Sequence, residues 1–118
     1  MTAGWIYHMC LRAEWEAAVR SGTYAGSSQD REDGFIHFST AEQLPESARK
    51  HRKGQPGLVL LAVDPHLLGD ALRWEPSRGG ALFPHLYAAL PVAAVRKVWD
   101  APLDAQGVPV LPEASLNR

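Results

Sequence analysis

A run of six apolar residues, Leu58-Val59-Leu60-Leu61-Ala62-Val63, constrains the fold of this chain more than any other segment. It has the length of an ordinary strand, and it ends at Asp64-Pro65, a pair typical of turns. A short apolar run that is bounded by turn signals is typical of a strand inside a hydrophobic core. We therefore expect residues 58–63 to form a buried strand.

Five further strands and two short helices are predicted from the remaining sequence. The strands are expected over 5–10, 35–38, 71–75, 85–90 and 94–99, and the helices over about 11–20 and 45–53. Gly22 is expected to end the first helix, and residues 22–33 are expected to form a loop because they lack apolar periodicity. A run of strands after the helices favours an α+β fold with a largely antiparallel sheet.

The chain has 118 residues, which suffice for one domain with a real core. We expect a single domain over 1–118, with its core at about 4–100 and an extended, proline-containing tail over 101–118. A net charge of -1 argues against a strongly basic nucleic-acid binder. The sequence has no signal-peptide pattern, and no apolar run approaches the ~20 residues of a membrane span, so we expect a cytoplasmic protein.

Two hydroxyl residues, Ser39 and Thr40, precede the second predicted helix. Ser39 with Glu42, or Thr40 with Gln43, has the spacing of a capping box. Pro45 is tolerated at the start of a helix but breaks its interior. The sequence therefore predicts a capped turn, followed by a helix that begins near Pro45.

Three histidines lie inside apolar segments: His8 in Ile6-Tyr7-His8-Met9, His37 in Phe35-Ile36-His37-Phe38, and His85 in Pro84-His85-Leu86-Tyr87. A buried imidazole needs hydrogen-bond partners, and for one histidine alone a satisfied core residue is the simplest explanation. Three histidines on three predicted strands instead indicate one convergent polar site. Histidine suits such a site because it acts as acid, base, donor or metal ligand near neutral pH.

Five further residues complete the predicted site: Tyr7, Ser39, Arg73, Glu75 and Tyr87. Arg73 and Glu75 flank Trp74, so the alternation of a strand places both on the face opposite Trp74. A structural ion pair between Arg73 and Glu75 explains their spacing about as well as a functional role does.

Several common catalytic motifs are absent from the sequence. It contains no G-x-S-x-G, G-x-G-x-x-G or P-loop pattern. No H-E-x-x-H pair supports a metal site, although three histidines with a carboxylate leave a metal-dependent enzyme open. Cys10 is interpreted as a small buried hydrophobe, and the basic run 49–53 as cations favoured at a helix C-terminus rather than a phosphate-binding patch.

Several blocks of the sequence, in order, resemble the bacterial domain-of-unknown-function family 952. They are Ile6-Tyr7-His8, Trp15 with Ala18, Gly22 with Tyr24, Gly34-Phe35-Ile36-His37-Phe38-Ser39-Thr40 with Gln43, Leu72-Arg73-Trp74-Glu75 and Phe83-Pro84-His85-Leu86-Tyr87. The resemblance covers nearly the whole chain up to Trp99. That family is in turn similar to the ADP-ribosyltransferase-like superfamily, which includes RNA 2'-phosphotransferases and diphtheria-type toxins.

The resemblance implies a compact α+β fold in which a split antiparallel sheet clasps an extended dinucleotide. It implies that His8 contacts the ribose next to nicotinamide and that His37 fills the second-strand position. The third catalytic position, a glutamate in many transferases, falls to Glu75 or His85. The cofactor-binding residues on this interpretation are Tyr7, Ser39, Arg73 and Tyr87, with Arg73 meeting phosphate.

We therefore expect the protein to bind NAD as a substrate, or an ADP-ribosylated or phosphorylated nucleotide, with transfer or cleavage at the ribose C1' or 2' position. One alternative is a non-catalytic nucleotide-binding domain. Another is a metal-dependent enzyme that uses His8, His37 and His85, although no metal is expected. The expected partner is a small nucleotide, with RNA less favoured, no membrane, and a monomer or weak dimer.

Overall fold

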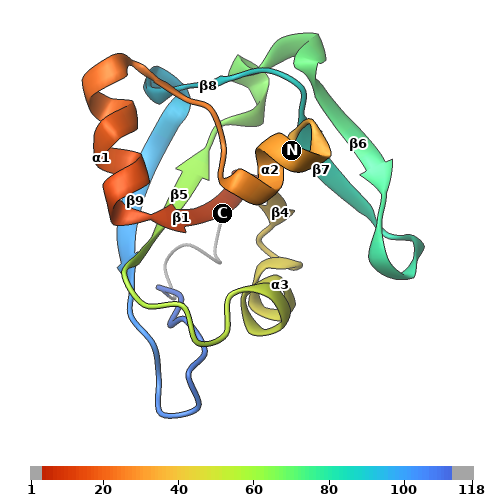
Figure 1. The fold of residues 1–118 in the computed structure, drawn as a ribbon. Coiled ribbons are helices and arrows are strands. Elements are labelled where there is room, and N and C mark those ends of the chain that lie inside the picture. The colour runs from red at the N-terminus through yellow and green to blue at the C-terminus, as the bar shows by residue number, and fades with distance from the viewer. Residues whose placement is uncertain (1–3, 113–118) are drawn as a thin grey trace.

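Three antiparallel sheets and three α-helices form the described part of the chain, residues 4–112 apart from the side chain of Arg78, in a computed structural model (Figure 1). The strands are β1 (Ile6–Leu11), β2 (Thr23–Tyr24), β3 (Ile36–His37), β4 (Ser39–Thr40), β5 (Leu58–Val63), β6 (Leu72–Pro76), β7 (Leu82–Leu86), β8 (Leu90–Pro91) and β9 (Val95–Ala101). The helices are α1 (Arg12–Ser21), α2 (Ser28–Asp33) and α3 (Leu44–His51). The predicted α+β class with antiparallel sheets is confirmed, with one helix more than expected.

The largest sheet has the strand order β4-β1-β5-β9, with every pair antiparallel. All six residues of β5 are buried, as the apolar run predicts. Its odd-numbered residues pack in one hydrophobic cluster with Ala18 of α1, and its even-numbered residues pack in a second cluster with Leu44 and Ala48 of α3. The sheet therefore has a core on each face, and this explains why β5 contains no polar residue.

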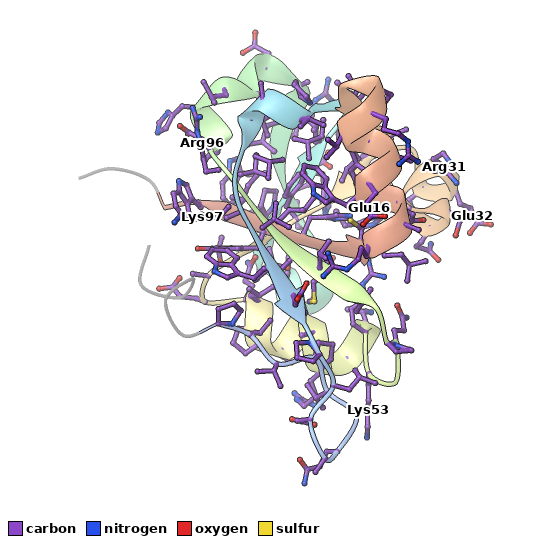
Figure 2. All side chains as sticks on the ribbon, turned by 90° about the vertical axis from the view of Figure 1, so that its left-hand side faces the viewer. Glu16, Arg31, Glu32, Lys53, Arg96 and Lys97 are labelled. Atoms are coloured by element: carbon purple, nitrogen blue, oxygen red, sulfur yellow. The ribbon has the colours of Figure 1, made fainter. Side chains whose placement is uncertain are left out.

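The outer edge of this sheet is charged. Arg96 and Lys97 are exposed on β9, and Figure 2 shows both side chains projecting away from the strand. Charged side chains on an edge strand oppose pairing with another chain. On β5, the inner neighbour of β9, no such charges occur, because both faces are covered.

A second sheet, β3-β7-β6, lies beside the first, and β2 pairs with β8 in a small third sheet (Figure 1). The predicted strand 35–38 is divided between the first two sheets. Its residues Ile36 and His37 pair with β7, whereas Ser39 and Thr40 pair with β1. Between them, the Phe38 N–H donates to the carbonyl of Pro84 at 3.0 Å. This one segment therefore fixes the second sheet against the first.

The prediction that residues 22–33 form a loop is wrong for α2. Ser27 caps this helix: its hydroxyl accepts from the N–H of Asp30 at 3.2 Å, and Asp30 accepts from the Ser27 N–H at 2.8 Å. Such a reciprocal pair is a capping box with aspartate in place of glutamate. Gly22 ends α1 with φ of 96°, as expected for a left-handed residue after a helix.

Thr40 precedes α3 as the sequence predicts. Its hydroxyl accepts from the Gln43 N–H at 3.2 Å, and the Gln43 side chain accepts from the Thr40 N–H at 3.1 Å. Of the two predicted capping boxes, the structure contains the one that joins Thr40 and Gln43. The helix begins one residue before Pro45 and ends at His51, two residues earlier than expected.

Two further boundaries differ from prediction. The strand expected over 85–90 is β7, which spans Leu82–Leu86. It begins earlier than expected because Pro84 lies inside the strand, where it pairs with Trp74 of β6. The tail expected to be extended folds back instead: Leu103 pairs with Pro109, and the carbonyl of Gly107 accepts from the Gly54 N–H at 2.7 Å. Residues 113–118 of the predicted tail lie outside the described residues. Among residues 4–112, no helix is long and apolar enough to cross a membrane.

Candidate functional site

A cavity of about 520 Å³ opens between the two larger sheets and the helices α2 and α3. Its walls combine aromatic and aliphatic side chains with histidines, carboxylates and one arginine. The lining residues are Tyr7, His8, Met9, Ser27, Gln29, Asp30, Asp33, His37, Phe38, Ser39, Leu44, Ser47, His51, Arg52, Gln55, Ser77, Phe83 and His85. Its volume lies within the range of about 300–1,000 Å³ that is typical of small-molecule sites.

The structure brings His8, His37 and His85 together at this cavity. The ring centroids of His37 and His85 lie 5.7 Å apart, and the Phe35 ring stacks on His85 at 4.2 Å. His37 and His85 are direct neighbours because their backbones pair across β3 and β7. The three histidines nevertheless differ in how their ring nitrogens are used.

His8 is a satisfied core histidine on the cavity wall. Its Nδ1 lies 2.6 Å from the carbonyl oxygen of His37, so this nitrogen carries the proton and donates. Its Nε2 then accepts from the hydroxyl of Tyr24 at 2.8 Å. Burial lowers the pKa of His8 and so favours this neutral form. Both ring nitrogens are thus committed to the protein, and His8 holds the backbone of His37 in place.

His37 lies between two carboxylates. Its Nδ1 is 2.5 Å from Asp30 Oδ1, and its Nε2 is 2.9 Å from Asp33 Oδ2. A carboxylate only accepts, so both ring nitrogens donate, which is the hydrogen-bonding pattern of an imidazolium. The side chain is 39% exposed and therefore remains accessible from the cavity.

Asp30 is the buried centre of this cluster, with a side chain only 3% exposed. Burial raises the pKa of a carboxyl group, but here the hydrogen bond from His37 and the backbone N–H groups of Ser27 and His37 outweigh it. Together they lower the pKa of Asp30 to about 2. Asp30 is therefore an anion at neutral pH and ties α2 to β3.

His85 differs because only one of its ring nitrogens is hydrogen-bonded to the described protein. Its Nδ1 donates to Glu75 Oε1 at 2.8 Å, and the Tyr87 hydroxyl donates to the same oxygen at 2.7 Å. These two hydrogen bonds lower the pKa of Glu75 and keep it ionised. Within residues 4–112, no group hydrogen-bonds to Nε2 of His85, and no buried side-chain nitrogen lacks a partner. Nε2 is therefore not fully buried, although His85 as a whole is only 6% exposed, and in the neutral ring it carries a lone pair.

The other predicted site residues divide into two groups. Tyr7 and Ser39 line the cavity, with Tyr7 only 1% exposed and the Ser39 hydroxyl donating to Ser47 at 3.0 Å. Glu75, Arg73 and Tyr87 are not among its lining residues.

Arg73 and Glu75 share one face of β6, as predicted, but Glu75 bonds to His85 and Tyr87 and not to Arg73. The guanidinium carbon of Arg73 instead lies 5.0 Å from the centroid of the Tyr87 ring, a cation–π contact. Arg73 does not line this cavity, so the prediction that it meets a phosphate stays untested.

Sequence reasoning missed Asp30, Tyr24 and Arg52 as parts of the site. The spacing of Ser27 and Asp30 is that of a capping box and could have revealed both α2 and its buried carboxylate. Tyr24 contacts His8 only through the tertiary fold, and no local pattern indicates that pairing.

The three-histidine metal site receives no support from the donor geometry, because His8 uses both nitrogens within the protein. Across residues 4–112, no group of three or more His, Cys, Asp or Glu side chains is arranged to hold a metal ion. Cys10 is buried, and burial raises the pKa of its thiol to about 12, as expected for an unreactive core cysteine.

The fold and the cavity define an α+β protein with a histidine-lined cleft between two antiparallel sheets. A family model described as "Protein of unknown function (DUF952)" matches residues 9–98, and the chain belongs to this family. The family predicted from the sequence blocks is thus confirmed. A comparison with curated proteins finds no match.

Solved structures share this fold. The X-ray crystal structure of protein CC0527 from Caulobacter crescentus is 51% identical, with 94% of this chain and 97% of that chain covered and a TM-score of 0.90. The solution NMR structure of CC0527 is 53% identical, with 89% and 90% covered and a TM-score of 0.79. Neither the family description nor these structures name the ADP-ribosyltransferase-like superfamily, so that relationship stays a prediction.

Proposed function

We propose that the cleft binds a phosphorylated nucleotide, either NAD or an ADP-ribosylated or phosphorylated nucleotide, and that His85 acts on its ribose as an acid–base group. The observation that carries this proposal is His85 on the wall of a cavity of about 520 Å³, with Nδ1 fixed on Glu75 and no protein partner at Nε2 among the described residues. A carboxylate that orients a histidine in this way fixes its tautomer and supports general acid–base catalysis. The aromatic Phe83 and the neighbouring His37 supply surfaces for a sugar and a base.

The geometry favours proton transfer at a ribose hydroxyl over transferase chemistry at C1'. Stabilising a ribosyl cation needs a carboxylate at the reacting carbon. Glu75 lies behind His85 and outside the cavity, and Asp30 and Asp33 are engaged by His37. In the balanced step, Nε2 of His85 takes the proton of a ribose hydroxyl and the hydroxyl oxygen forms a bond to a neighbouring phosphorus of the ligand. The bond from that phosphorus to its leaving oxygen breaks, and the leaving oxygen takes the proton back from His85.

Binding and turnover test the two parts of the proposal separately. Calorimetry with NAD, ADP-ribose and a nucleoside 2'-phosphate would measure binding by the wild type, His37→Ala and His85→Ala. His66→Ala is the matched control because His66 is exposed in a turn and does not line the cavity. We expect His37→Ala to weaken binding and His66→Ala to leave it unchanged.

Assays of phosphate-ester release would then test catalysis, and nicotinamide release would report the less favoured chemistry at C1'. Glu75→Gln should lower the rate and spare binding, as expected for a group that acts mainly on the transition state. Binding without turnover would support a non-catalytic nucleotide-binding domain. Failure of the wild type to bind any of the three ligands would refute the proposal.

A further inference from the structure

Arg52, directly after α3, turns its side chain into the wall of the cleft. Its Nη2 donates to the carbonyl oxygen of Met9 at 2.6 Å, and its Nη1 donates to Gln55 Oε1 at 3.1 Å. Arg52 is half-buried and lines the cavity. The guanidinium is therefore held between β1 and the turn after α3 in one fixed orientation.

Both of these partners are neutral, so no acidic group of residues 4–112 forms an ion pair with Arg52. In residues 4–112, the ion pairs of arginine involve Arg12 with Asp100 and Arg49 with Glu46, and none involves Arg52. Arginine stays charged in proteins and has more N–H donors than two acceptors use. Arg52 is half-buried, and this partial loss of hydration favours an anionic ligand as a further partner.

The cavity's own carboxylates do not neutralise Arg52. Asp30 and Asp33 both contact His37, on the side of α2 and β3. Arg52 is near enough to the buried His8 for its charge to contribute to the lowered pKa of that histidine. The cleft thus contains a paired group of two carboxylates with His37, and an arginine whose positive charge is unpaired.

Arg49, Lys50 and Lys53 are surface cations outside the cavity, unlike Arg52. Arg49 and Lys50 lie 4.0 Å and 3.1 Å from Glu46, one helical turn earlier, as ordinary surface pairs. Lys53 is exposed, and Figure 2 shows it in the lower part of the view. Arg52 alone of these four residues lines the cavity.

We propose that Arg52 forms the phosphate-binding subsite of the cleft, a role that the family resemblance implied for Arg73. The planar guanidinium matches a phosphate group through two parallel hydrogen bonds. Ser47, His51 and Gln55 line the same cavity and surround the subsite with polar groups. The identification of the ligand as a nucleotide rests on the proposed function, whereas the phosphate subsite itself does not.

Titration with inorganic phosphate and pyrophosphate, followed by amide NMR at constant ionic strength with chloride as the reference anion, tests this inference. In the wild type we expect saturable shifts centred on residues 47–55 and on Met9. Arg52→Gln should weaken pyrophosphate binding by at least about tenfold, since a charge-assisted bidentate contact is lost. Arg73→Gln, the matched control, should bind pyrophosphate like the wild type.

Equal pyrophosphate affinity in the wild type and Arg52→Gln, or shifts centred on Arg73, would overturn the inference. Should Arg52→Gln fail to fold, Arg52→Lys keeps the charge and loses the planar fork. Weaker binding by Arg52→Lys supports the subsite, and unchanged binding overturns it.

Nucleotide titrations separate this inference from the proposed function. Binding of pyrophosphate at Arg52 without binding of any nucleotide would refute the nucleotide proposal and leave the subsite standing. Nucleotides that bind the wild type and Arg52→Gln equally would refute the subsite alone.

Discussion

Replacing Asp30 by asparagine tests the electrostatic core of the site. The variant keeps the size of the side chain but removes the charge that accepts from His37 and from the backbone of Ser27. The native fold lowers the pKa of Asp30 from 3.8 to about 2. Since one pKa unit corresponds to about 1.36 kcal/mol, the ionised carboxylate stabilises the fold by roughly 2 kcal/mol at neutral pH.

The pH dependence of this effect has a definite sign. A carboxyl group whose pKa is depressed by folding stabilises the native state above its unfolded pKa, here 3.8, and the stabilisation is lost as the pH falls through the folded value of about 2. About half of the contribution should be gone near pH 3. The free energy of unfolding of Asp30→Asn should therefore lie roughly 2 kcal/mol below that of the wild type at pH 7 and approach it at low pH.

Urea unfolding of both proteins from pH 7 down to the acid limit of the fold would measure this difference. Asp33→Asn is the matched control, because Asp33 also contacts His37 but is 36% exposed. An exposed ion pair is worth less than about 1 kcal/mol, so this variant should lose little stability. A constant gap between the wild type and Asp30→Asn at all pH values would refute the linkage between this carboxylate and folding.

Three further variants or measurements test other parts of the structure. Thr40→Ala should lower the free energy of unfolding by about 1 kcal/mol, because the hydroxyl that accepts from the Gln43 N–H is lost. Thr40→Ser should retain most of the wild-type stability, and equal unfolding curves for Thr40→Ala and the wild type would contradict the cap. Tyr24→Phe leaves Nε2 of His8 without its donor and should cost about 1–3 kcal/mol in urea unfolding, whereas a stability unchanged from wild type would remove this hydrogen bond from the core. Cys10 should resist alkylation in native buffer and react in urea, and rapid native labelling would contradict its burial.

Local features of the fold were predictable because neighbouring residues decide them. The apolar run of β5 requires burial on both faces, and Thr40 with Gln43 forms a cap through atoms three residues apart. The helix α2 was not predicted because its mostly charged and polar residues show no apolar periodicity. The spacing of Ser27 and Asp30, which form its capping box, was nevertheless visible in the sequence. A capping pattern without an apolar stripe is thus sufficient for a short helix when one carboxylate is buried.

The boundary of β7 depended on a distant contact. Proline lacks an N–H donor and is disfavoured inside a sheet, so the sequence favoured a strand that begins after Pro84. In the fold, the Pro84 carbonyl accepts from Phe38 at 3.0 Å, and Trp74 pairs with Pro84 from β6. These contacts carry the strand through the proline and place Phe83 on the cavity wall beside His85.

The sequence by itself determined that three histidines lie in apolar strands, because the apolar residues on both sides of each histidine indicate a buried strand. Only the tertiary structure decided what each imidazole does. His8 contacts Tyr24, His37 contacts Asp30, and His85 contacts Glu75 through one ring nitrogen only. Hydrogen-bond roles depend on atoms that are brought within about 3 Å by separate elements, and a linear pattern does not encode those distances.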